Sequence, residues 1–80
     1  MTESEALNLK LHDVFIFPDG YVNSGMKHVI HNYKCTILAV IIDNETLQGF
    51  TVKRYLKTKN RYAYEFFDVF KVIQRCHLAA

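Results

Sequence analysis

Histidines and cysteines are the residues of this chain whose types and spacing could hold a metal ion. His28, His31 and Cys35 follow one another at intervals of three and four residues, and Cys76 stands near the C-terminus. Two thiolates and two imidazoles form a common structural zinc set. On a helix, however, the first three would face away from the apolar residues of their own segment, and Cys35 opens an apolar run in which a thiol behaves as a small hydrophobic group. The sequence therefore predicts no metal and no other cofactor, with these four residues as the alternative.

Groups that catalyse reactions do not form a recognisable set. Cys76 and His77 are neighbours near the C-terminus, but no paired carboxylates accompany a histidine. Gly20, Gly25 and Gly49 are too widely separated to form a phosphate-binding loop. We therefore predict that the chain is not an enzyme.

Positive charge is concentrated in one short segment. Residues 53–61 contain five basic residues, no acidic residue and an interleaved tyrosine. The basic residues are Lys53, Arg54, Lys57, Lys59 and Arg61. Cations pair with phosphates and exposed rings stack on unpaired bases, so the pattern suits single-stranded nucleic acid. The alternative is a solvated strand and turn whose lysines prevent edge pairing with other chains, and the pI near 8.6 is lower than in strongly basic binding domains.

Three segments have the patterns of strands. Residues 9–17 alternate and end in an aromatic, β-branched run before Pro18-Asp19-Gly20, which predicts a turn. Residues 35–42 are apolar on both faces, as in the middle of a sheet, and residues 50–56 follow after a polar loop, so these two predict a hairpin. Residues 1–8 are polar and are expected to be frayed, which leaves residues 9–80 as the single domain.

Two segments show helical spacing. The first predicts a helix from about Gly25 to Lys34, with Ser24 as its N-cap, and the second predicts a C-terminal helix over residues 62–73. Their stripes consist of Met26, Val29, Ile30 and Tyr33 in the first, and Tyr62, Phe66, Val69, Phe70 and Ile73 in the second. The predicted fold is α/β (α+β), a small mixed three-stranded sheet in the order strand–helix–strand–strand–helix, with the helices packed on the sheet.

The predicted C-terminal helix is apolar over more of its surface than a helix on a monomer needs. We expect Phe67, with Tyr64 and Val72, to lie in an interface between identical chains rather than in the monomer core. The alternative is that the sheet and the first helix cover the whole apolar arc. Self-association is also favoured because a core of this size supplies only roughly 3–5 kcal/mol.

Composition limits the class of protein. Half of the 80 residues are apolar and the net charge is +2, which excludes a disordered chain. Two cysteines do not make a disulfide framework, the N-terminus lacks signal-peptide features, and the longest apolar run has six residues where a membrane span needs about 20. These features predict a cytoplasmic protein with reduced thiols and no membrane contact. The leading hypothesis is a non-enzymatic protein-interaction or regulatory module acting as a homo-oligomer; the alternative is a small nucleic-acid-binding protein that uses residues 53–61.

Overall fold

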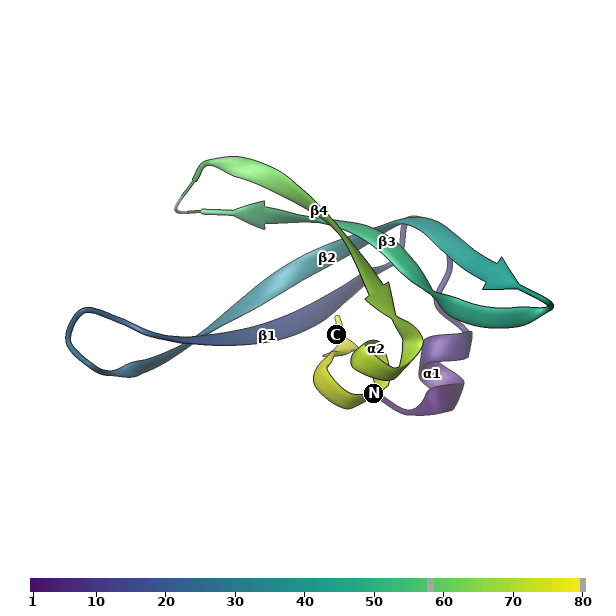
Figure 1. Ribbon diagram of the computed structural model, residues 1–80, viewed down its shortest axis with the longest axis horizontal. Helices are drawn as coiled ribbons and strands as arrows, with labels where there is room; N and C mark the ends of the chain where they lie inside the picture. Colours follow the sequence, from purple (N-terminus) through teal and green to yellow (C-terminus); the bar gives the residue numbers. More distant parts are fainter. Residues whose placement is uncertain (58, 80) are drawn as a thin grey trace.

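Figure 1 shows the computed structural model, which describes residues 1–57 and 59–79, as a strongly twisted sheet with two short helices on one side. The sheet is antiparallel, and its strand order is β4-β3-β2-β1-β5. Strands β1 to β4 follow one another as a meander, in which each strand pairs with the next. The elements are α1 (Glu3–Leu7), β1 (Val14–Val22), β2 (His28–Asp43), β3 (Thr46–Leu56), β4 (Arg61–Asp68), α2 (Val69–Arg75) and β5 (His77–Leu78).

The prediction of a mixed three-stranded sheet is wrong, and its first helix is a strand. Most of residues 25–34 belongs to β2, which pairs with β1 from His28 onward. Ser24 does not cap a helix, because the neighbouring Asn23 closes a turn instead. The Asn23 side-chain oxygen accepts hydrogen bonds from the backbone N–H groups of Gly25 at 2.9 Å and Lys27 at 3.0 Å. A β-hairpin therefore replaces the predicted crossover helix.

Strand β1 also continues through Pro18-Asp19-Gly20, where the sequence predicts a turn. Proline is accepted in a strand when its missing N–H would face an outer edge. In the described chain β1 pairs with β5 at Phe15 and Ile16 alone, so its outer edge is open at Pro18. The strand thus keeps its pairing with β2, in which Pro18 lies opposite Asn32.

The second predicted helix is divided between β4 and α2. The division falls at Asp68, whose carboxylate accepts a hydrogen bond from the backbone N–H of Lys71 at 2.8 Å and caps the start of α2. Residues before Asp68 alternate between the two faces of the sheet, whereas Val72 on α2 points into the core. One apolar stretch therefore supplies both a sheet edge and the helix that covers the sheet.

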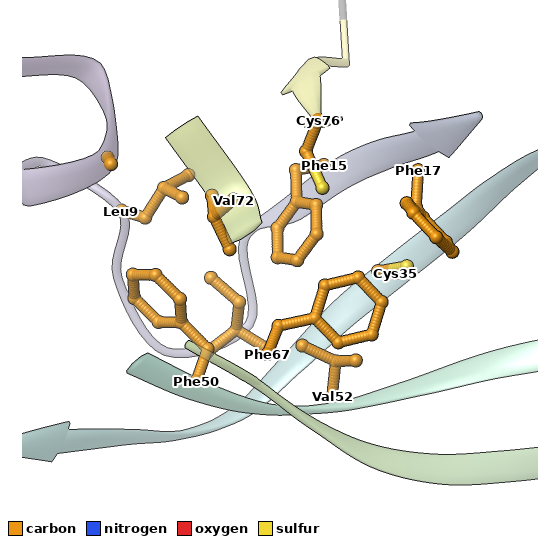
Figure 2. Packing of buried hydrophobic residues seen from close by; sticks show 11 residues of the cluster. Leu9, Phe15, Phe17, Cys35, Phe50, Val52, Phe67, Val72 and Cys76 are labelled. Carbon is orange, nitrogen blue, oxygen red and sulfur yellow. The ribbon is translucent and has the colours of Figure 1, made fainter. Parts of the chain in front are cut away.

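The core lies between one face of the sheet and the two helices (Figure 2). The rings of Phe15 and Phe17 pack on Phe67 with centroid distances of 5.7 and 5.0 Å. The buried residues are Ala6, Leu9, Phe15, Phe17, Cys35, Ile37, Phe50, Val52, Phe67, Val72 and Cys76. Four buried phenylalanines from three strands, Phe15 and Phe17 on β1, Phe50 on β3 and Phe67 on β4, therefore fill the space under the helices.

The N-terminal residues form a capped helix where fraying is expected from the sequence. Thr2 and Glu5 make a reciprocal capping box, in which the hydrogen bond from the Thr2 backbone lowers the pKa of the Glu5 carboxyl. The terminal ammonium of Met1 donates to the carbonyl oxygens of Ile73 at 3.0 Å and Cys76 at 2.6 Å. These bonds hold α1 against the end of α2. Neither helix of the described chain is long and apolar enough to cross a membrane.

Candidate nucleic-acid interface

The face of the sheet opposite the helices carries a row of exposed aromatic side chains. Side chains alternate along a strand, so the residues next to the buried ones point away from the core. On β4 the exposed fractions are 52% for Tyr62, 68% for Tyr64 and 52% for Phe66, and Tyr55 on β3 is 40% exposed. We call these four residues the aromatic row. No described element covers them.

The pairing of β3 with β4 fixes the positions of these rings. Tyr55 lies opposite Tyr62, and their ring centroids are 5.4 Å apart in an edge-to-face arrangement. The Tyr55 hydroxyl donates a hydrogen bond to the side-chain oxygen of Asn60 in the connection. Lys53 lies opposite Tyr64, and its ammonium nitrogen is 5.0 Å from the centroid of the Tyr62 ring. A cation and several aromatic faces therefore share one surface.

Phe66 ends the aromatic row over a glycine. A Cβ atom on Gly49 would lie 2.7 Å from the end of the Phe66 ring and 2.8 Å from the Cα of Asp68. Only glycine leaves room for β4 to approach β3 this closely. Gly49 therefore leaves room for the Phe66 ring beside β3.

The five basic residues predicted to bind nucleic acid do not act as one group. Lys53 lies on the aromatic face, Lys57 and Lys59 lie in the β3–β4 connection, and Arg61 begins β4. Within residues 1–57 and 59–79 the ion pairs involve Arg54 alone. The charges of the other four are therefore not neutralised by an ion pair in the described chain.

Arg54 points to the opposite face, where carboxylates and an aromatic ring of neighbouring strands surround its guanidinium group. Its Nε donates to the carboxylate of Glu65 at 2.7 Å, and its Nη1 lies 3.7 Å from the carboxylate of Asp19. The guanidinium carbon is 4.5 Å from the centroid of the Tyr33 ring, and the side chain is 15% exposed. Arg54 thus joins β3 to β1, β2 and β4 and is separated from Lys53 on the aromatic face.

The predicted interface residues Tyr64, Phe67 and Val72 are likewise separated. Phe67 and Val72 are fully buried in the core of the single chain, because β4 is a strand whose Phe67 side chain points toward α2. Tyr64 points the other way and belongs to the aromatic row. The period of two in Tyr62, Tyr64 and Phe66 is the sequence signal that identifies this row, and the helical interpretation overlooks it.

The predicted metal alternative is not assembled either. His28 and His31 lie an odd number of positions apart on β2 and therefore point to opposite faces. His31 shares a hydrogen bond of 2.9 Å with the hydroxyl of Tyr21. Cys35 and Cys76 are buried, and burial raises the pKa of their thiols to about 12 and about 11, which keeps them protonated. The described residues contain no group of three or more His, Cys, Asp or Glu side chains placed to hold a metal ion.

Comparison with known proteins does not add to this geometry. No protein-family model matches the sequence. No significant match is found among curated proteins or among solved structures. The aromatic row and the charges around it are therefore the features of the chain that indicate a function.

Proposed function

We propose that the chain binds single-stranded nucleic acid, with bases stacked on the aromatic row and phosphates held by basic residues of the β3–β4 hairpin. The observation that carries the proposal is the exposure of three aromatic rings at every second position of β4, beside a lysine on the same face. Aromatic rings with one free face are the platform on which unpaired bases stack, at about 1–3 kcal/mol for each base.

The spacing of the rings fits this ligand. Alternate residues of a strand are about 6.8 Å apart, which is roughly twice the 3.4 Å that separates stacked bases. Tyr62, Tyr64 and Phe66 can therefore each receive one base of an extended strand. Stacking of this kind tolerates any base, so we expect weak dependence on sequence.

The charge distribution supports the same ligand class. Lys53, Lys57, Lys59 and Arg61 all belong to this hairpin, and the nearby acid Glu65 is engaged by Arg54 on the other face. Lysine and arginine that neutralise phosphates release counterions from the nucleic acid. The proposal therefore requires binding that weakens steeply with salt.

Self-association through the aromatic row is the competing function, and it follows the leading hypothesis from the sequence. A second copy would bury the same rings, and a two-fold axis brings identical surfaces together. It would also bring the two Lys53 side chains and their basic neighbours close to one another, and like charges facing each other oppose association. A polyanion removes that repulsion, so the geometry supports nucleic acid better.

Fluorescence anisotropy with labelled oligothymidine and with single-stranded RNA of mixed sequence tests the proposal. We expect Tyr64→Ala to weaken binding by roughly 5- to 150-fold, the equivalent of about 1–3 kcal/mol for one stacked base. Binding should weaken with salt along a straight line when the logarithm of the association constant is plotted against the logarithm of the salt concentration. The joint replacement of Lys57, Lys59 and Arg61 by alanine should make the slope of this line less steep by about 0.7 for each lost phosphate contact. Tyr21→Ala is the matched control, because Tyr21 is an exposed tyrosine of the other hairpin.

Two results contradict the proposal. One is the absence of any anisotropy change at low salt with either oligonucleotide. The other is equal binding by Tyr64→Ala and the wild type. If light scattering also shows a concentration-dependent dimer that Tyr64→Glu converts to monomers, the aromatic row is a self-association surface.

A further inference from the structure

The two long hairpins of the sheet separate at one end and leave a fork between them. The β2–β3 ladder ends at the pair Cys35–Arg54, whereas β2 begins at His28 and β3 continues to Leu56. In Figure 1 the β1–β2 hairpin and the β3–β4 hairpin diverge beyond this point. A cavity of about 440 Å³ lies in the fork, lined by five consecutive residues of β2 (Ile30, His31, Asn32, Tyr33 and Lys34) and by Tyr55 and Lys57. The fork is thus built along the edge of a strand.

Hydrogen bonds elsewhere in β2 show which backbone groups point into the fork. Ile37 bonds on the β1 side, donating to the carbonyl of Asp13 and accepting from His12, each at 2.9 Å. The carbonyl of Lys27 also bonds on that side, accepting from Asn23 at 3.0 Å. Backbone groups alternate along a strand, so odd-numbered residues of β2 face β1 and even-numbered ones face the other side.

Ile30 and Asn32 therefore direct their N–H and C=O groups into the fork. No described residue pairs with either one there, because the ladder with β3 has ended. The position of Pro18 agrees with this assignment: it lies opposite Asn32, at a pair that exchanges no hydrogen bonds, and its missing N–H faces outward. The free edge of β2 is a template for one more strand.

We propose that the fork binds an extended peptide segment of a partner protein, which adds a strand to the edge of β2. Main-chain hydrogen bonds to Ile30 and Asn32 would supply affinity, and side-chain contacts would supply specificity. The charged residues that line the cavity are Lys34 and Lys57, both basic. Lys34 projects to one face of β2, and the rings of His31 and Tyr33 project to the other. The segment that fits is therefore one in which Asp or Glu alternates with β-branched residues.

The contacts of Arg54 hold the base of the fork in place in the unbound chain. The Arg54 guanidinium lies on the Tyr33 ring at 4.5 Å and is bonded to Glu65. These contacts join the two hairpins at the last pair of the ladder. The groove is therefore formed before the peptide arrives, which lowers the entropic cost of binding.

A phage library of random seven-residue peptides, panned on the wild-type chain, tests the proposal. We expect enrichment of proline-free sequences in which acidic and β-branched residues alternate. Asn32→Pro removes the N–H that faces the fork and should weaken the binding of these peptides by roughly tenfold, the equivalent of about one backbone hydrogen bond. Asn32→Ala keeps that N–H and is the matched control, for which binding should be unchanged.

Amide hydrogen exchange on the wild-type chain gives a second measurement that does not depend on whether Asn32→Pro folds. Saturating peptide should slow exchange at Ile30 and Asn32 and leave the outer edge of β4 unchanged. The proposal is overturned if no peptide is enriched, if Asn32→Pro binds the enriched peptides as well as Asn32→Ala does, or if the peptides slow exchange along β4 instead. Slowing of Ile30 and Asn32 by oligothymidine alone would assign the fork to nucleic acid and would also overturn it.

Discussion

Phe66 and Phe67 are neighbours of the same type on opposite faces of β4, so replacing each by leucine tests the assignment of the two faces. Phe67 is fully buried, and its ring pairs with Phe15 at 5.7 Å and with Phe17 at 5.0 Å. Leucine loses both aromatic pairs, each worth about 0.5–1.5 kcal/mol, so Phe67→Leu should lower the free energy of unfolding by about 1–3 kcal/mol. Phe67→Ala would cost roughly 3–5 kcal/mol, comparable with the whole stability of so small a core.

Phe66→Leu should cost less than about 1 kcal/mol, because the Phe66 ring is half exposed and changes at exposed positions are usually small. Urea denaturation followed by circular dichroism, at two protein concentrations that differ tenfold or so, measures both variants. Equal losses of stability at the two positions would refute the assignment of faces. A loss at Phe66 that disappears on dilution would show that the aromatic row is buried between copies of the chain.

Two further predictions concern stability. Gly49→Ala should lower the free energy of unfolding by about 1–3 kcal/mol, because the added Cβ would overlap the backbone of β4 and the Phe66 ring; a urea midpoint equal to that of the wild type would contradict the close approach of β3 and β4. In the folded chain the thiols of Cys35 and Cys76 have pKa values of about 12 and about 11, above the ordinary 9.0, so the unfolded chain loses these protons first. Stability should therefore fall as the pH rises above about 9, by up to roughly 1.4 kcal/mol per pH unit for each thiol, and Cys35→Ala should reduce that slope when urea midpoints are compared between about pH 8 and pH 10.

The centre of the sheet is the part of the fold that the sequence predicts correctly. Residues 35–42 are apolar on both faces, and residues 50–56 follow after a polar loop; these segments pair as the β2–β3 hairpin. The turn between them is made by Asn44 and Glu45, both with positive φ angles. Strands in the middle of a sheet carry a pattern that depends little on distant residues, which is why local reasoning succeeds here.

The outer strands could not be assigned in the same way. Val29, Ile30 and Tyr33 fit a helical period and are also good strand formers, and the β1–β2 hairpin extends beyond the core, so burial does not impose a clear alternation on it. In residues 62–73 the period changes from two to 3.6 at Asp68. The prediction of one helix for the whole segment misses this change of period. It also misses the placement of Phe67 and Tyr64 on opposite faces of β4.

The basic residues were identifiable from the sequence, whereas their grouping was not. A count of charges in residues 53–61 places Arg54 with its neighbours. The structure places Arg54 on the other face, because the side chains of neighbouring residues in a strand point to opposite faces. There its Nε donates a hydrogen bond to the Glu65 carboxylate on the adjacent strand at 2.7 Å. The bond depends on the β3–β4 register, which no local pattern reveals.

The aromatic row is the feature of this chain that folding alone explains least. The core is already filled by Phe15, Phe50 and Phe67 on the covered face. Rings exposed on the other face add little to stability and favour aggregation, which is why contiguous apolar surface on a small protein indicates a binding site. Lys53 and the basic connection place cations beside these rings, and a polyanion with stackable bases matches both features at once. Tyr55 and Lys57, next to the turn of the same hairpin, line the fork. One short piece of chain, from Lys53 to Phe66, therefore contributes to both proposed binding surfaces, while the opposite face of its strands maintains the core.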